Sequence, residues 1–135
     1  MQKDDPVVIV GMARTPMGAF QGELAGFTAV DLGGVALGES LRRSGLQPAD
    51  IDDVIMGCVL PAGQGQAPAR QASLKAGLPE STGATTISKM CGSGMKAVMF
   101  AHDNLLAGSA AIMLAGGMES MTNAPYIMDK ARGGF

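Results

Sequence analysis

The feature that most restricts the fold of this chain is a regular alternation of short apolar runs with helical patterns. The apolar runs are bounded by glycine, proline or polar residues, as the strands of a sheet are. They occupy Pro6–Gly11, Asp53–Val59, Gly83–Ser88 and Ala111–Ala115, and helical patterns fill Thr28–Ser44, Pro68–Ala76 and the segment after Cys91. Strands that alternate with helices form βαβ units with right-handed crossovers. We therefore predict an α/β fold with a largely parallel sheet and helices on both of its faces.

The first helix has recognisable signals at both ends. Thr28 is a typical N-cap residue, and Asp31, three residues later, suits the second position of a capping box. Gly45 follows the helical pattern, where a glycine commonly ends a helix. Gly33 and Gly34 lie inside this helix at a cost of about 1 kcal/mol each. Close packing of the helix against another element would explain them.

Composition excludes several classes of function. The net charge is −2 and the isoelectric point is near 5.2, so no electrostatic attraction to nucleic acid or to an anionic membrane is expected. The sequence contains no apolar run of membrane-spanning length and begins without a leader-like apolar segment. Its two cysteines, Cys58 and Cys91, are too few for a disulfide framework and lack the spacing of metal ligands. We therefore expect a cytoplasmic protein without a metal, a nucleic-acid partner or a membrane anchor.

Cys91 lies between the third predicted strand and the third predicted helix. The triplet Gly92-Ser93-Gly94 opens the helix, and Gly108 ends it. Apolar residues and one histidine recur at intervals of three and four, which places them on one helix face: Met95, Val98, Met99, His102, Leu105 and Leu106. The pattern therefore predicts that Cys91 occupies the turn where a strand leads into a helix N-terminus.

This position favours reactivity of the Cys91 sulfur. The first N–H groups of a helix have no intrahelical acceptor, and the helix dipole is positive at that end. Both favour the thiolate, which is the nucleophilic form of cysteine. Gly92 and Gly94 would also let a substrate carbonyl approach closely. On position alone Cys91 is either a nucleophile or a small core residue, because free cysteines are often buried.

A dinucleotide-binding turn is an alternative interpretation of the same glycines. The residues Gly92, Gly94 and Ala97 fit the pattern Gly-x-Gly-x-x-Ala, and Glu119 follows about 20 residues on, where a ribose-binding carboxylate is expected. This interpretation leaves Cys91 without a role. Glu119 is also suited to hydrogen bonding with backbone groups of a glycine-rich turn, and we favour that interpretation over a direct role in catalysis.

Four segments of the chain together resemble the thiolase family. They are Arg14–Gly18, Gly65–Gln71, Ile87–Met95 and Ala115–Pro125. The segment around Cys91 is similar to the nucleophile signature of thiolases, and the last segment is similar to a second signature of their N-terminal half. The resemblance covers nearly all of the chain after Asp5, and within the family it is closest to acetyl-CoA acetyltransferases.

The resemblance implies a thiolase-like fold, in which two similar α/β halves stack as α-β-α-β-α layers. Residues 1–135 would form most of the N-terminal domain, incomplete without its fifth strand, and the C-terminal domain and the coenzyme A loop domain would be absent. The strand Gly83–Ser88 would lie at the edge of the sheet and pair with its twin in a homodimer or a tetramer. A non-catalytic fragment that dimerises is therefore an alternative to an enzyme.

The implied reaction is acyl transfer through Cys91, with coenzyme A thioesters as substrates and no further cofactor. The thiolate would attack acetyl-CoA to form an acetyl-cysteine, with the Cys91 N–H in the oxyanion hole. A second acetyl-CoA would then yield acetoacetyl-CoA, and the reverse reaction would be thiolysis. Met118, Met121 and Asn123 would line the substrate pocket.

Two further groups that the family needs, a histidine base and a second cysteine, lie in segments that these 135 residues do not contain. The single histidine, His102, is eleven residues after Cys91, about 16 Å along one helix. We therefore expect a structural role for His102. Cys58 lies in a predicted strand and is expected in the core. The resemblance thus implies that the 135-residue chain is inactive by itself.

Overall fold

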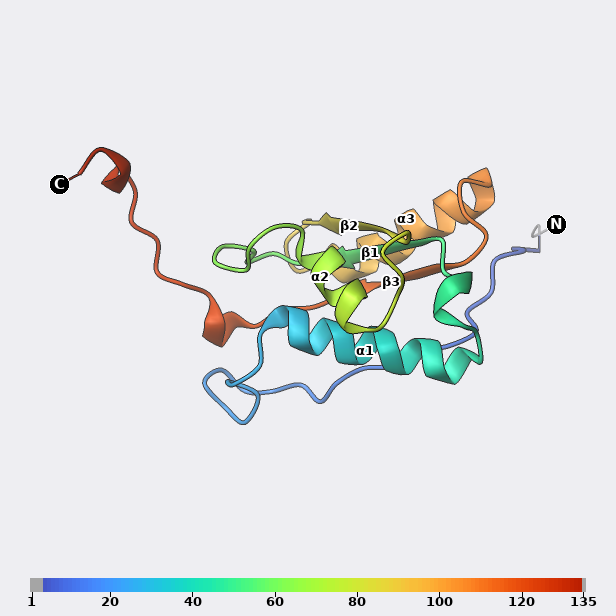
Figure 1. The fold of residues 1–135 in the computed structure, drawn as a ribbon, viewed down its shortest axis with the longest axis horizontal. Coiled ribbons are helices and arrows are strands. Elements are labelled where there is room, and N and C mark those ends of the chain that lie inside the picture. The colour runs from blue at the N-terminus through green and yellow to red at the C-terminus, as the bar shows by residue number, and fades with distance from the viewer. Residues whose placement is uncertain (1–3, 135) are drawn as a thin grey trace.

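Three of the four predicted strands pair into one parallel sheet in the computed structural model, which describes residues 4–134 (Figure 1). The strands are β1 (Asp53–Gly57), β2 (Gly83–Ile87) and β3 (Met113–Gly117), in the spatial order β2-β1-β3. The register aligns Gly57 with Ile87 on one side and with Gly117 on the other. The carboxyl ends of all three strands therefore lie level at one edge of the sheet.

Helices cover both faces of this sheet, as the alternation of patterns predicts. The helices are α1 (Ala29–Ser44), α2 (Pro68–Lys75) and α3 (Ser93–Ala107), with single 3₁₀ turns at Pro48–Asp50, Met121–Asn123 and Ala131–Gly133. α2 packs on β1 and β2 and α1 packs on α2, whereas α3 packs on β1 and β3. Val54 and Met56 belong to the core cluster shared with α1 and α2, while Gly57 contacts α3. Because alternate residues of a strand face opposite ways, the helices lie on opposite faces.

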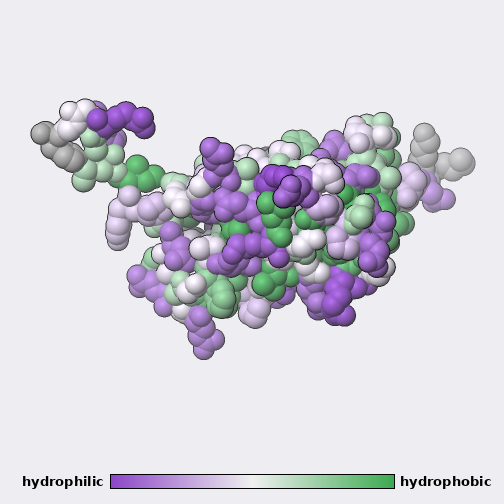
Figure 2. All heavy atoms as spheres, in the orientation of Figure 1, coloured by the Kyte–Doolittle hydropathy of each residue, from purple (hydrophilic) through white to green (hydrophobic). Residues whose placement is uncertain are grey.

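The main hydrophobic core lies between the sheet and the α1–α2 layer. Its buried members are Ala29, Val30, Leu37, Leu41, Ile51, Val54, Met56, Cys58, Ala69, Ala72, Leu78 and Met118. Cys58 is 2% exposed, so the prediction of a core position for this cysteine is confirmed. On the face that Figure 2 shows, hydrophilic and hydrophobic residues are interspersed, and the segment after Met121–Asn123 extends away from the body of the molecule.

The signals read for the first helix are confirmed in α1. The Asp31 N–H donates to the Thr28 hydroxyl over 3.1 Å, and the Thr28 N–H donates to the Asp31 carboxylate over 2.9 Å, which completes the capping box. Gly45 ends the helix at φ +75°. A Cβ atom on Gly33 would overlap the Met118 sulfur, and one on Gly34 would lie 2.9 Å from the Lys75 Cβ. These two glycines therefore permit the close approach of α1 to its neighbours.

The face of α3 that meets the sheet consists of small residues. Ser93, Ala97 and Ala101 are the buried residues of this helix. Several members of the apolar stripe at three- and four-residue intervals are exposed instead: Met95, Val98, Met99 and Leu106. Small side chains let the axis of α3 lie close to the strands. The spacing of apolar residues identified the stripe correctly, but it did not indicate which face of the helix is buried.

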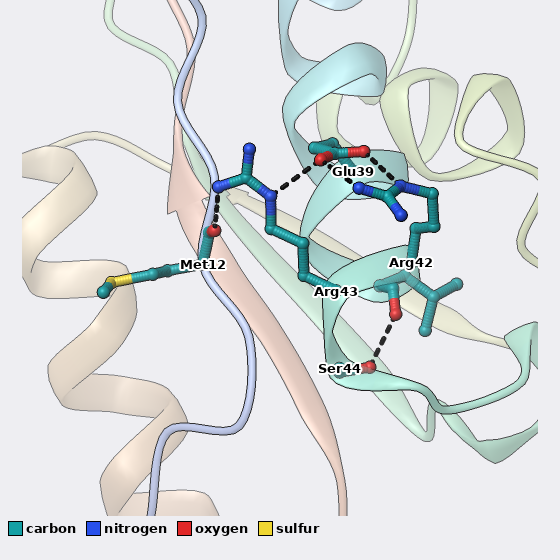
Figure 3. A network of polar contacts seen from close by, with 6 residues as sticks. Met12, Glu39, Arg42, Arg43 and Ser44 are labelled. Carbon is teal, nitrogen blue, oxygen red and sulfur yellow. Dashed lines mark hydrogen bonds and ion pairs between the residues drawn. The ribbon is translucent and has the colours of Figure 1, made fainter.

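The prediction of a strand at Pro6–Gly11 is wrong. The segment is extended, but it pairs with no strand among residues 4–134, and Val8 and Ile9 are 73% and 78% exposed. It is held instead near its two ends, where Asp5 contacts His102 of α3 and Arg43 of α1 donates to the Met12 carbonyl over 3.0 Å (Figure 3). β-branched residues favour a strand, but a ladder also requires an adjacent strand, which the pattern cannot reveal.

The fourth predicted strand begins two residues later than expected. The Ala111 and Ile112 N–H groups both donate to one Asp52 carboxylate oxygen, over 2.7 and 3.0 Å. These two bonds hold the pKa of Asp52 below its ordinary value. The Asp52 carboxylate thus accepts the hydrogen bonds that the Ala111 and Ile112 N–H groups would otherwise donate to backbone carbonyls of a neighbouring strand. Regular pairing of β3 starts at Met113 and continues to Gly117.

We expect Gly33→Ala to lower the free energy of unfolding by about 1–3 kcal/mol, because the new methyl group overpacks the contact with Met118 and Ala72. Gly38→Ala is the matched control in the same helix. Its Cβ would lie 3.7 Å or more from the nearest atoms, so removal of a helical glycine should stabilise by about 0.5–1 kcal/mol. Urea denaturation of both variants measures the difference, and equal shifts would contradict the packing argument.

Candidate active site

Cys91 lies in the turn between β2 and α3, two residues before the first helical residue. The turn is closed by backbone bonds from the Gly92 N–H to the Lys89 carbonyl and from the Ser93 N–H to the Met90 carbonyl, over 3.1 and 3.0 Å. Met90 has a φ of +48°, a left-handed conformation that is rare for residues other than glycine. Cys91 itself is exposed. The structure therefore presents the sulfur at the surface, in the strand-to-helix turn where the sequence places it.

The Ser93 side chain holds this turn from inside. Its hydroxyl accepts from the Lys89 N–H over 2.7 Å and donates to the Met90 carbonyl over 2.6 Å. Ser93 is only 4% exposed, so its hydroxyl is buried although the turn that it holds is exposed. The sequence motifs described above give no role to this serine. The sequence feature that indicates this role is the position of the serine between two glycines at the start of a helix. A small side-chain hydroxyl there can reach the preceding turn.

Glycines on two strands bring the start of α3 into contact with the sheet backbone. A Cβ atom on Gly57 of β1 would lie 2.6 Å from the Ser93 Cβ, and one on Gly117 of β3 would lie 3.1 Å from the Gly94 Cα. Any side chain at Gly57 would push the helix away. The first turn of α3 thus rests directly on the carboxyl ends of β1 and β3, and this contact sets the position of Cys91.

The N-terminus of α3 has no side-chain cap. Its N-cap residue is Gly92, whose backbone is not in a capping conformation and which makes no side-chain hydrogen bond. Helix N-termini without such a cap present N–H groups and a positive dipole to nearby anions. A thiolate on Cys91, or an oxyanion formed beside it, would lie next to these groups.

Cys58 occupies the opposite kind of environment. Burial raises the pKa of this thiol, and the charge of Glu119, whose Oε1 lies 3.6 Å from the sulfur, raises it further. At neutral pH the sulfur is therefore held as a thiol. Of the two cysteines, Cys91 is the one with an accessible sulfur.

Glu119 makes its hydrogen bonds with the backbone of the segment that follows β1. Its two oxygens accept from the Val59 N–H over 2.8 Å and from the Leu60 N–H over 3.1 Å. The expected binding to backbone groups is thus present, although the partners lie after β1 rather than in the glycine-rich turn beside Glu119. Both carboxylate oxygens are engaged, which removes support for Glu119 as the ribose-binding residue of a dinucleotide site.

The three residues proposed to line a substrate pocket do not share one cavity with Cys91. Met118 and Met121 line a cavity of about 560 Å³ between α1 and the N-terminal segment, together with Arg14. Asn123 lines a smaller cavity of about 310 Å³, and its amide donates to the Ala25 and Phe27 carbonyls and to the Ser120 hydroxyl. The amide of Asn123 therefore holds the loop before α1, and substrate binding by these three residues stays a prediction.

His102 is directed to the N-terminal segment. Its Nε2 lies 2.8 Å from an Asp5 oxygen, and this contact raises the pKa of the histidine. With about 16 Å of helix between His102 and Cys91, His102 is not the base for this cysteine. Among residues 4–134 no three His, Cys, Asp or Glu side chains form a group that could bind a metal. None of the helices described in that range has the length and apolar character needed to cross a bilayer.

The fold and the cysteine turn define an α/β protein with an accessible thiol at a helix N-terminus. Residues 7–135 match the family described as Thiolase, N-terminal domain, and the chain therefore belongs to the thiolase family. An acetyl-CoA acetyltransferase of Cupriavidus necator is 52% identical over 129 residues, which cover 96% of this chain and 33% of the relative. The relative named "Acetyl-CoA acetyltransferase ERG10, cytosolic", from Gibberella zeae, is 48% identical over 129 residues, which again cover 96% of this chain and 33% of the relative.

A solved structure of the same family agrees with the fold. The crystal structure of Acat5 thiolase from Ascaris suum in complex with coenzyme A superposes with a TM-score of 0.89 at 39% identity, covering 94% of this chain and 34% of that one. The chain therefore spans about a third of the length of the relatives it matches. The thiolase resemblance drawn from the four sequence segments is confirmed.

We expect iodoacetamide to modify Cys91 at least about tenfold faster than Cys58 at neutral pH, because Cys58 is buried and its raised pKa leaves little thiolate. Since that pKa is raised, labelling of Cys58 should increase only as the pH rises beyond the ordinary range of a thiol. Mass spectrometry of the two peptides gives both rates. The Cys58→Ala variant should leave the Cys91 rate unchanged, and unfolding in denaturant should bring the two rates together. Equal rates in the native protein would contradict the assignment.

Proposed function

We propose that this chain supplies the nucleophilic cysteine of an acetyl-CoA acetyltransferase, and that this cysteine is Cys91. The observation that supports the proposal most strongly is an exposed thiol in the turn before a helix whose N-terminus lacks a side-chain cap. The relatives named acetyl-CoA acetyltransferases suggest the substrate class. Coenzyme A thioesters would be the substrates, so the proposal includes no separate cofactor.

In the proposed reaction the Cys91 thiolate attacks the carbonyl carbon of acetyl-CoA. The bond between that carbon and the coenzyme A sulfur breaks, coenzyme A leaves as a thiolate that takes up a proton, and the acetyl group stays on Cys91. The second cysteine of the family, which lies outside these 135 residues, would take a proton from the α-carbon of a second acetyl-CoA. That carbon then attacks the acetyl group and releases the Cys91 thiolate. The product is acetoacetyl-CoA, and thiolysis follows the same steps in reverse.

The backbone at the start of α3 would stabilise the charge that develops in both steps. Each attack places a negative charge on the carbonyl oxygen, and an N–H donor fixed beforehand stabilises such an oxygen without reorganisation. We assign the Cys91 N–H to this role. The bonds of Ser93 to Lys89 and Met90 support the assignment, because they hold the turn that contains this N–H.

In a protein that joins these 135 residues to the histidine and second-cysteine segments of the family, we expect acetyl-CoA to leave one acetyl group on the peptide that contains Cys91, detected by mass spectrometry after rapid acid quenching. Cys91→Ser should abolish this acetyl-thioester. Cys58→Ala is the matched control, and it should retain the label because Cys58 lies in the core on the other face of the sheet. A label on Cys58, or an unlabelled Cys91 peptide in the folded protein, would contradict the proposed function.

We also propose a homodimer or a tetramer in which β2 pairs with β2 of a second subunit. Within the described sheet β2 is an edge strand, and unpaired edges favour association with another strand. The Gly83 N–H donates to Asp52 and the Ile87 carbonyl accepts from Cys58, so Gly83, Thr85 and Ile87 face β1. The backbone groups of Ala84 and Thr86 therefore point outward.

We expect Ala84→Pro to shift the protein towards monomer in analytical ultracentrifugation, because proline removes an outward N–H and leaves the bonds to β1 in place. Ser109→Ala, at an exposed position outside the sheet, is the control and should leave the oligomeric state unchanged. Association that persists unchanged in a folded Ala84→Pro variant would exclude this edge as the interface.

The cytoplasmic location expected from the sequence stays a prediction. The Gibberella zeae relative is named cytosolic, and a Xenopus laevis relative with 52% identity over 124 residues is named mitochondrial. The names of the relatives therefore include more than one compartment.

A further inference from the structure

Glu119 binds three consecutive residues of a distant segment with one carboxylate. The Val59 and Leu60 N–H groups donate to its two oxygens, and the Cys58 thiol lies 3.6 Å from Oε1. Two backbone N–H groups in succession form a concave site for an anion, and hydrogen bonds to a carboxylate are stronger than those to a neutral acceptor. Glu119 thus links the segment that follows β1 to the segment that follows β3 through these hydrogen bonds.

The segment after β1 is also held from its other side. The Gln64 side chain donates to the Leu60 carbonyl over 2.8 Å and to the Cys58 sulfur over 3.5 Å. The Gln71 side chain of α2 in turn donates to the carbonyls of Gln64 and Gln66, over 2.6 and 2.7 Å. Because α2 anchors one side of the segment, the carboxylate of Glu119 determines where the other side lies relative to β3.

These contacts lie next to the backbone on which the Cys91 helix rests. The Cys58 N–H donates to the Ile87 carbonyl over 3.0 Å, and the Met118 N–H donates to the Gly57 carbonyl over 2.9 Å. Cys58 follows Gly57 directly, and Glu119 is two residues from Gly117. A shift between the two segments would therefore move Gly57 and Gly117 beneath Ser93 and Gly94, with which they are in contact.

We propose that Glu119 is a positioning residue for Cys91: it locks the carboxyl ends of β1 and β3 together beneath the first turn of α3, and so fixes the sulfur and the Cys91 N–H relative to a bound thioester. This inference rests on the proposed acyl transfer through Cys91. Glu119 touches neither the substrate nor the reacting atoms in this assignment. It acts through the backbone of Gly57 and Gly117.

The test uses a protein that also carries the histidine and second-cysteine segments of the family, and it compares Glu119→Gln and Glu119→Asp with the wild type in single-turnover acetylation of Cys91 by acetyl-CoA. Glutamine keeps the size of the side chain but replaces one acceptor oxygen with an NH₂ group that faces a donor. We expect the maximal acetylation rate to fall between about 10-fold and about 100-fold. The acetyl-CoA concentration at half the maximal rate should change less than about twofold, because misplacement affects reaction rather than binding. Glu119→Asp, which keeps both oxygens, should recover part of the rate.

Two controls separate positioning from a general loss of stability. Glu23→Gln, at an exposed glutamate, should leave the rate unchanged. Leu41→Ala weakens the core at the far end of α1 and should not slow acetylation per folded molecule. The iodoacetamide rate of Cys91 should also stay within about twofold of wild type in Glu119→Gln, because this small reagent requires only an exposed thiol.

A second measurement reports whether the contact with Glu119 exists in solution. The Glu119 charge raises the pKa of Cys58, so Glu119→Gln should move the pH profile of Cys58 alkylation to lower pH. A shifted profile together with wild-type acetylation would overturn the inference and leave the proposed function intact. An equal loss of acetylation in Leu41→Ala would overturn it as well. A wild-type protein that is not acetylated on Cys91 would overturn both.

Discussion

The position of Cys91 depends on a direct contact between a helix and the backbone of two strands. Gly57 and Gly117 lie at the same level of the sheet, and the first turn of α3 packs against them with no room for a Cβ atom on Gly57 and little room for one on Gly117. The buried face of α3 continues this contact with small residues, Ala97 and Ala101. Small residues on both sides therefore set the distance between helix and sheet, and this distance places the cysteine turn at the carboxyl edge of the strands.

The same sheet creates opposite environments for its two cysteines. Cys58 continues β1 on the face covered by α1 and α2, where burial and the Glu119 charge keep it protonated. Cys91 follows β2 into a turn that leads to the other face, where its thiol is exposed beside an uncapped helix end. The difference in reactivity expected of the two cysteines thus follows from their positions. Cys58 lies in the buried layer after β1, and Cys91 lies in the exposed turn before α3.

Local signals in the sequence predicted those elements that local chemistry determines. These elements depend on residues near one another or on the absence of a side chain. They are the capping box of α1, the close packing of Gly33 and Gly34, the strands β1 and β2 and the turn around Cys91. The strand expected at Pro6–Gly11 and the start of β3 were wrong, because the first lacks an adjacent strand and the second is delayed by the Asp52 carboxylate. Both errors arise from residues distant in sequence.

The contacts of Glu119 show what the register of the sheet adds to a sequence motif. Glu119 is about sixty residues from its partners Val59 and Leu60, so no spacing along the chain connects them. Once β1 and β3 are known to be parallel with Gly57 opposite Gly117, the residues just beyond those glycines must leave the sheet side by side. A carboxylate on one exit and unpaired N–H groups on the other are then within reach of each other. The sheet register, combined with the glycines at the strand ends, therefore carries the information that links the partly buried Glu119 contact to the nucleophile turn.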